Sequence, residues 1–125
     1  DRREYPWGSV FAEKENVFPC NCLEFWQVSK TKSQSPPVPV TTPVDQFDAA
    51  NGSSPWGVQG MGGNVWEWTS TEIPRKDKPG AAPFRVVKGG SFMTPERALR
   101  SANVFAEDPR LAHPDVGFRC AQDVQ

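Results

Sequence analysis

One stretch decides how this chain of 125 residues folds: Gly60-Met61-Gly62-Gly63-Asn64-Val65-Trp66-Glu67-Trp68-Thr69. Its glycines permit a tight turn or a backbone with positive φ. Strict alternation follows, which places Trp66 and Trp68 on one face of a predicted strand and Glu67 on the other. We expect both tryptophans to pack in the core. Three environments suit the Glu67 carboxylate: water, a paired cation or a bound metal.

The composition excludes several classes of protein. The net charge is -1, so we expect no binding to nucleic acid or to an anionic membrane surface. No apolar run approaches the about 20 residues of a membrane span. The 10 glycines and 13 prolines predict much irregular structure, while five tryptophans and eight phenylalanines supply surface for one compact domain. Because the chain begins at Asp1 rather than at methionine, we expect it to be a piece of a longer protein.

Three cysteines, Cys20, Cys22 and Cys120, leave two interpretations open. They are structural thiols, with or without one bridge to Cys120, or they belong to a metal or redox site. A bridge between Cys20 and Cys22 is disfavoured because one intervening residue strains disulfide geometry. The single histidine, His113, is expected in a solvated loop. Ser91, His113 and Asp115 have the residue types of a hydrolytic triad, but their spacing does not bring them together.

Few regular elements are predicted. Residues 18–26 are expected to be buried irregular structure or a short strand, and residues 29–42 an exposed loop rich in Pro, Ser and Lys. Strands are expected at 84–88, continuing past a bend, and at 116–121, with Phe118 and Cys120 pointing inward. Residues 94–102 fit either a short helix or an ordered loop.

Five motifs in order carry a family resemblance: Tyr5-Pro6-Trp7-Gly8, Pro43-Val44, Gly63-Asn64-Val65-Trp66-Glu67-Trp68, Lys88-Gly89-Gly90-Ser91-Phe92 and Gly117-Phe118-Arg119-Cys120. Together they resemble the formylglycine-generating enzymes, or sulfatase-modifying factors, a branch of the C-type lectin-like folds. The resemblance implies a loop-rich α+β domain with few short strands. It also implies that residues 1–125 are the C-terminal portion of one such domain. Its partner is then its own N-terminal half or a companion chain. Cys120 stands where relatives often have a cysteine that forms a disulfide with that half.

The resemblance also implies a copper site that this chain lacks. In the formylglycine-generating enzymes, two cysteines after the Gly-Gly-Ser unit bind copper, which soft thiolates favour. Counted without gaps, those positions here are Thr94 and Leu99. We therefore expect no copper and no formylglycine generation. One alternative is a domain or subunit of a metal-dependent oxidoreductase whose metal ligands lie outside this chain.

Calcium is the cofactor that the resemblance leaves open. The implied ligands are the carbonyls of Gly63 and Val65 and the carboxylate of Glu67. Gly60 stands where relatives place an Asp or Asn ligand, and calcium needs six to eight oxygens. The competing interpretation of Glu67 is a structural carboxylate that is hydrogen-bonded or paired with arginine. A second implied site, beginning at Asn21, lacks an acidic partner.

The segment between Ser91 and Gly117 is the predicted ligand-binding surface. Scaffolded loops with aromatic and arginine side chains are typical of binding sites. Relatives of this fold include the bacterial or phage-type variable proteins of diversity-generating retroelements, which display binding residues here. The resemblance thus implies a non-catalytic module for a protein or peptide ligand. Its candidate residues are Phe92, Thr94, Glu96, Arg97, Arg100, Asn103 and Phe105.

Two alternatives to this surface stay open. In the first, Arg97 and Arg100 only brace the fold through carboxylates such as Glu67. In the second, the chain is a structural domain of a larger signalling protein.

Overall fold

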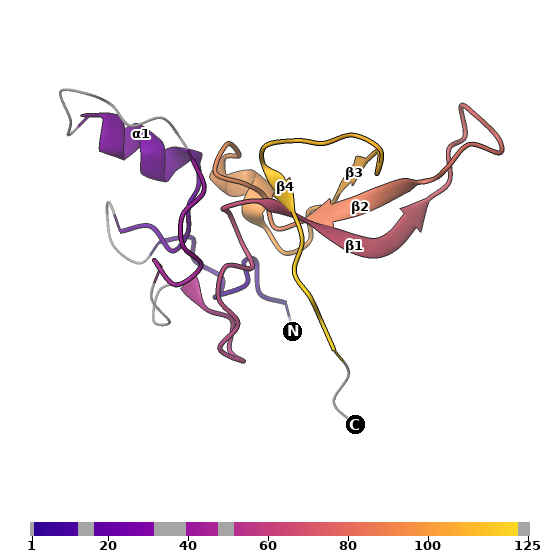
Figure 1. Ribbon diagram of the computed structural model, residues 1–125. Coiled ribbons are helices and arrows are strands. Elements are labelled where there is room, and N and C mark those ends of the chain that lie inside the picture. Colours follow the sequence, from indigo (N-terminus) through magenta and orange to yellow (C-terminus); the bar gives the residue numbers. More distant parts are fainter. Residues whose placement is uncertain (1, 13–16, 32–39, 48–51, 123–125) are drawn as a thin grey trace.

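The computed structural model describes residues 2–12, 17–31, 40–47 and 52–122 (Figure 1). Within these ranges the chain forms one α-helix, α1 (Leu23–Thr31), and one short 3-10 helix, η1 (Glu96–Leu99). The strands are β1 (Trp66–Ile73), β2 (Phe84–Lys88), β3 (Phe105–Glu107) and β4 (Val116–Gly117). The predicted α+β class with short strands is confirmed. No helix in this described part is long and apolar enough to cross a membrane.

The four strands form one sheet in the order β3-β2-β1-β4. β1 pairs with β2, and β2 with β3, in antiparallel fashion, whereas β4 lies parallel to β1. The register places Glu67 opposite Lys88 on one side and opposite Gly117 on the other. Since directly opposed residues of a sheet are close neighbours, Glu67 and Lys88 belong to one local environment.

The glycine bend before β1 has the conformation that its sequence favours. Gly63 has φ of +76°, and a Cβ at this position would collide with the carbonyl oxygen of Asn21. Asn64 follows with φ of 66°, a conformation that asparagine tolerates better than most residues. Its side chain bonds to the backbone of Thr42 twice, at 2.9 Å and 3.1 Å. The bend therefore ties the start of the sheet to the loops beneath α1.

Helix α1 corrects two predictions. Residues 18–26 were expected to contain no helix, yet α1 begins at Leu23, with Glu24 in its first turn, where a negative charge stabilises a helix. The loop expected at 29–42 overlaps the end of α1 at residues 29–31. Residues 32–39 lie outside the described ranges, and residues 40–42 form neither helix nor strand.

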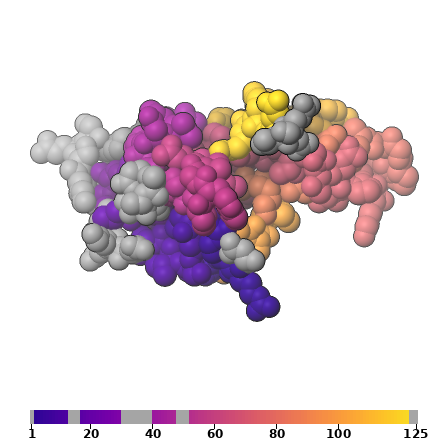
Figure 2. Space-filling model, turned by 90° about the horizontal axis from the view of Figure 1, so that it is seen from below, coloured from indigo at the N-terminus to yellow at the C-terminus, as the bar shows by residue number. Residues whose placement is uncertain are grey.

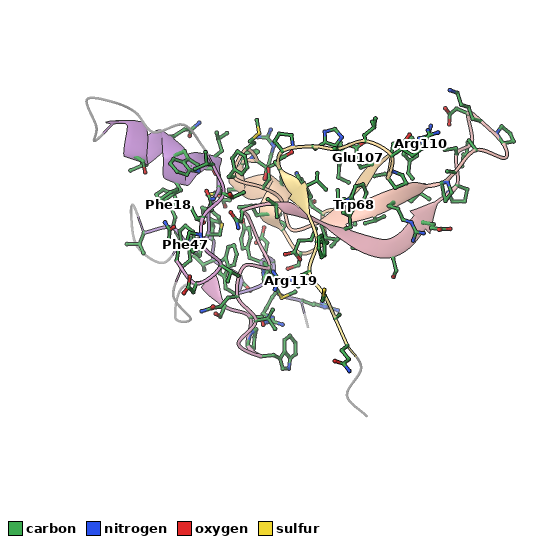
Figure 3. The ribbon with its side chains drawn as sticks, viewed as in Figure 1. Phe18, Phe47, Trp68, Glu107, Arg110 and Arg119 are labelled. Atoms are coloured by element: carbon green, nitrogen blue, oxygen red, sulfur yellow. The ribbon has the colours of Figure 1, made fainter. Side chains whose placement is uncertain are left out.

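The core lies on the helix side of the sheet and consists largely of aromatic rings. Tyr5 stacks on Trp7 with ring centroids 5.4 Å apart. Further ring contacts lead to α1, beneath which Phe18 and Phe47 lie (Figure 3). At the centre are four buried side chains, Tyr5, Cys20, Cys22 and Leu99.

Trp66 and Trp68 are half-buried, so the prediction that both pack in the core is wrong. Trp66 instead tilts against Phe105, 6.0 Å away, which is itself 56% exposed. Phe118 and Cys120 were also expected to point inward, but both are exposed. The reason is that β4 ends at Gly117, and the chain then runs away from the sheet (Figure 1).

All three cysteines are free thiols, of which Cys20 and Cys22 are buried. A hydrogen bond with Cys22, together with burial, raises the pKa of the Cys20 thiol well above its usual range. Protonated, buried thiols are poor nucleophiles and poor metal ligands. The described residues contain no cluster of three metal-binding side chains. Of the two interpretations, structural thiols fit the structure.

Candidate functional site

A cavity of about 270 Å³ opens where the N-terminal segment meets the sheet. Figure 2 shows this side of the molecule, with the indigo N-terminal segment beside the magenta segment that precedes β1. We call this space the seam cavity. Its apolar wall comes from Tyr5, Pro6, Trp56, Met61 and Leu99. Three cations and one carboxylate also line it: Arg3, Lys88, Arg100 and Glu67.

The two positions that the family resemblance assigns to copper cysteines, Thr94 and Leu99, both lie next to Gly90, and Leu99 also lines the seam cavity. A Cβ on Gly90 would collide with Leu99 and would lie 2.8 Å from Oγ1 of Thr94. The Thr94 hydroxyl is occupied locally, since it accepts from the Ser91 amide at 2.8 Å and donates to the Ser91 carbonyl at 2.9 Å. Leu99 is 1% exposed. The site thus presents methyl groups and a hydroxyl where copper chemistry needs two thiolates.

Arg119 holds Glu67 from the C-terminal segment, below the start of β1 (Figure 3). Its Nε lies 3.0 Å and 2.9 Å from the two carboxylate oxygens, and its Nη2 lies 2.6 Å from Oε1. The same guanidinium donates to the carbonyls of Gln59 at 3.0 Å and Gly60 at 2.9 Å. These bonds to Glu67 raise the pKa of Arg119, against the effect of burial. Glu67 is therefore an arginine-paired carboxylate, and its partner is neither Arg97 nor Arg100.

This arrangement does not fit the calcium ion that the sequence left open. Calcium would need the Glu67 carboxylate together with the carbonyls of Gly63 and Val65. The Arg119 guanidinium already donates hydrogen bonds to both oxygens of that carboxylate. A side chain at Gly60, where relatives place the missing ligand, would project between Val44 and Arg119, since a Cβ there would lie 3.1 Å from Val44 and 3.6 Å from the guanidinium. A divalent ion there would face a neighbouring positive charge, which disfavours its binding.

Asn21, the start of the second implied calcium site, is fully engaged by protein. It is 1% exposed, and its Oδ1 accepts from the indole of Trp26 at 2.6 Å. Its Nδ2 donates to the Val40 carbonyl at 2.8 Å and to Oδ1 of Asn64 at 3.1 Å. A buried amide with these partners is a structural hub.

The cations of the seam cavity differ in how they are compensated. Arg100 pairs with Glu4 at 2.8 Å, and a hydrogen bond with Tyr5 is the main reason that its pKa is raised. Lys88 donates to the Ser101 carbonyl at 2.6 Å. Within the described residues no carboxylate lies within ion-pair distance of Lys88, although Glu67 is its partner in the sheet. Burial lowers the pKa of Lys88, as expected for a cation without a counter-charge.

Only Arg100 of the seven predicted ligand-binding residues lines the seam cavity. Phe92 is 7% exposed and packs inside, and Thr94 bonds to Ser91. Glu96 accepts from the Tyr5 hydroxyl at 2.8 Å. The remaining three are exposed or half-buried elsewhere: Asn103 donates to the Arg97 carbonyl, and Phe105 lies on β3.

Arg3, Trp56 and Lys88 are among the cavity residues that the sequence did not indicate as ligand-binding. Trp56 is 77% exposed, and the Arg3 guanidinium lies 4.9 Å from its ring centroid. The signal available for Trp56 was its place in a Pro-Trp-Gly turn, because turns lie at the surface and tryptophan is enriched at interfaces.

Ser91, His113 and Asp115 do not form a triad. Ser91 is fully buried, and its hydroxyl donates to Oδ2 of Asp115 at 2.7 Å. His113 instead faces Glu107, with Nε2 and Oε2 3.6 Å apart. The fold thus brings Ser91 and Asp115 together, which their spacing did not predict, but the serine lacks a histidine base and access to substrate.

Comparison with known proteins identifies the class. Residues 1–124 match the domain family described as sulfatase-modifying factor enzyme 1-like, so the chain belongs to this formylglycine-generating-enzyme-like family. The resemblance predicted from five motifs is confirmed.

Individual relatives match most of this chain. It is 34% identical to the formylglycine-generating enzyme of Thermomonospora curvata, over 98% of this chain and 44% of the relative. It is 28% identical to the inactive C-alpha-formylglycine-generating enzyme 2 of Bos taurus, over 94% of this chain and 36% of the relative. The crystal structure of CarF superposes with a TM-score of 0.51 at 29% identity, covering 62% of this chain and 26% of CarF. The chain thus spans less than half the length of these proteins.

Proposed function

We propose that this chain is a non-catalytic module that binds a protein or peptide ligand in the seam cavity and does not generate formylglycine. The observation that carries the proposal is that Thr94 and Leu99 lie together beside Gly90, with Leu99 in the wall of this cavity. The enzyme chemistry implied by the family needs two thiolates at that point. Similarity to a protein named as an inactive member of the family supports the same conclusion.

The composition of the cavity supports binding. Ligand sites are concave and mostly apolar, with a few polar groups that orient the ligand, and roughly 300–1,000 Å³ in volume for drug-sized ligands. The seam cavity, at about 270 Å³, suits one large side chain with its adjoining backbone. Trp56 and Met61 at its wall are 77% and 42% exposed, so apolar surface is available to a partner. Aromatic, methionine and arginine side chains are the types enriched at interfaces.

The test has a binding arm and an activity arm. We expect a library of defined peptides to yield binders, and Trp56→Ala to abolish their binding without unfolding the protein. Phe105→Ala is the matched control, because Phe105 is also an exposed aromatic residue but lies on β3. Binding that survives Trp56→Ala but not Phe105→Ala would disprove the assignment. Conversion of a peptide cysteine to formylglycine by the copper-supplied protein would disprove the non-catalytic role.

The two other functions expected from the sequence stay predictions. An oxidoreductase domain whose metal ligands lie outside this chain would carry stoichiometric iron or copper in the purified full-length protein. A purely structural domain of a signalling protein would show no peptide binding at all.

A further inference from the structure

We propose that the ligand of the seam cavity is an acidic peptide, in which an aromatic or aliphatic side chain enters the cavity and a neighbouring carboxylate meets Lys88. This inference rests on the proposed function and names its ligand class. Three observations support it: the balance of charge at the cavity, the place of Lys88, and a second hollow beside the first.

The charged residues at the cavity leave an excess of positive charge. Arg3, Lys88 and Arg100 line it, against one carboxylate, Glu67. Arg119 neutralises Glu67 through both carboxylate oxygens, and Glu4 neutralises Arg100, so the charge left for a ligand is centred on Lys88. Clefts lined by one sign of charge attract ligands of the other sign.

Lys88 is the cation best placed to receive a carboxylate. It ends β2 directly opposite Glu67, and its ammonium group makes one hydrogen bond, to the Ser101 carbonyl. An ammonium group has three donors, so two remain for a ligand. Because Lys88 is partly withdrawn from water, an anion placed there interacts more strongly than it would at an open surface.

A second hollow extends the basic surface along the N-terminal segment. It shares Arg3, Arg100 and Ser101 with the seam cavity and adds Arg2 and Glu4. Glu4 is paired with Arg100, so the added charge is that of Arg2. A continuous groove of this kind suits an extended chain better than a single small anion. The ligand is accordingly a peptide with more than one acidic residue.

The apolar part of the ligand is set by Trp56 and its neighbours. Tyr5, Met61 and Leu99 form the wall beside it. The Arg3 guanidinium lies over the Trp56 ring, so an aromatic surface and a cation lie side by side at the cavity. A phenylalanine flanked by aspartates therefore combines both requirements in three residues.

Two peptides of equal shape provide the test: acetyl-Asp-Phe-Asp-amide and acetyl-Asn-Phe-Asn-amide. We expect the acidic peptide to bind the full-length protein at least about tenfold more tightly by isothermal titration calorimetry, the factor that one charge-assisted hydrogen bond supplies. The preference should shrink as salt is raised. Equal binding of the two peptides would overturn this inference and leave the proposed function standing. Binding of an oligonucleotide in place of the acidic peptide would overturn it as well.

Variants of one lysine locate the preference. Lys88→Met keeps the aliphatic stem and should erase the preference, whereas Lys88→Arg should retain it. Lys78→Met is the matched control, because it changes the net charge equally at an exposed position between β1 and β2. Loss of the preference in Lys78→Met as well would show only a general effect of charge, and would contradict the role given to Lys88. Circular dichroism of each variant verifies folding.

Discussion

The helix half of the molecule, residues 5–47, and the sheet half, residues 66–117, are stabilised by different means. In its described residues, the helix half has few regular backbone bonds outside α1 and depends on stacked rings and on one buried amide, that of Asn21. The sheet half has a hydrogen-bonded ladder, with ion pairs at its rim. Stability in the helix half is therefore concentrated in a few side chains. In the sheet half it is spread over the backbone, and single substitutions should cost less.

The largest expected effect is that of Asn21→Ala. This change leaves the Trp26 indole without its partner and removes the bonds to the Val40 carbonyl and to Asn64, so it should lower the free energy of unfolding by about 3 kcal/mol. Urea denaturation measures this. Ser29→Ala is the control within α1, since it removes one local bond to the Phe25 carbonyl and should cost less than about 1 kcal/mol. Equal costs for the two variants would contradict the contrast between the halves.

A smaller effect is expected for Gly90→Ala beside the sheet. Gly90 has φ of +77°, and a Cβ there would also collide with Leu99. Gly80 has φ of +85°, and a Cβ there would meet no atom within 4 Å, so Gly80→Ala isolates the backbone strain. We expect about 1 kcal/mol for Gly80→Ala and about 2 kcal/mol for Gly90→Ala. Thermal unfolding that ranks them in the opposite order would be inconsistent with the packing of Leu99.

Arg119→Met should cost about 1–2 kcal/mol, since it removes charge-assisted bonds that are partly exposed to water. Arg97→Met, at an exposed arginine, is the control and should cost little. Because Arg119 supplies the positive charge beside Glu67, adding calcium or EDTA should leave the unfolding temperature of the wild type unchanged. A rise of several degrees in the unfolding temperature on adding calcium would contradict the interpretation that the Arg119 guanidinium takes the place of a calcium ion.

The smallest expected effect appears only in acid. Hydrogen bonds from Arg110, and then from Arg75, hold the pKa of Asp108 well below its usual range. A carboxyl whose pKa is lower in the folded state stabilises the fold above its unfolded pKa of about 3.9, and that contribution is lost as the pH falls further. Wild-type stability should therefore fall more steeply below pH 4 than that of Asp108→Asn, by urea denaturation at each pH. Asp45→Asn, at an exposed aspartate, should follow the wild type.

The sequence predicted the family and the sheet better than the helix side. The motifs around Gly63, Gly90 and Gly117 are local, and each determines a bend or a strand by itself. Helix α1 was missed because Phe25 and Trp26 are frequent in strands, and because the residues after them resemble a loop. The helix is favoured because Phe25 packs against a cluster that includes Tyr5 and Leu99, and these two residues lie far away in sequence.

The candidate site could be predicted only in part. The pairing of Glu67 with an arginine was foreseen as one alternative, but not its partner, since Arg119 lies 52 positions away. The seam cavity joins Arg3, Trp56 and Lys88, and no spacing rule connects three separate segments. Alternation correctly places Trp66 and Trp68 on one face of the strand, but it does not show whether other residues cover that face. The assignment of both to the core was therefore wrong.

Nuclear magnetic resonance of the indole N–H groups tests the central claim most directly, because it shows where the ligand binds. As acetyl-Asp-Phe-Asp-amide is added, the Trp56 signal should shift progressively. The signal of Trp66, which points to the opposite face of β1 from Glu67, should stay in place, as should that of Trp26, which is bonded to Asn21. A shift of Trp66 with Trp56 unchanged would contradict the assignment of the seam cavity as the binding site.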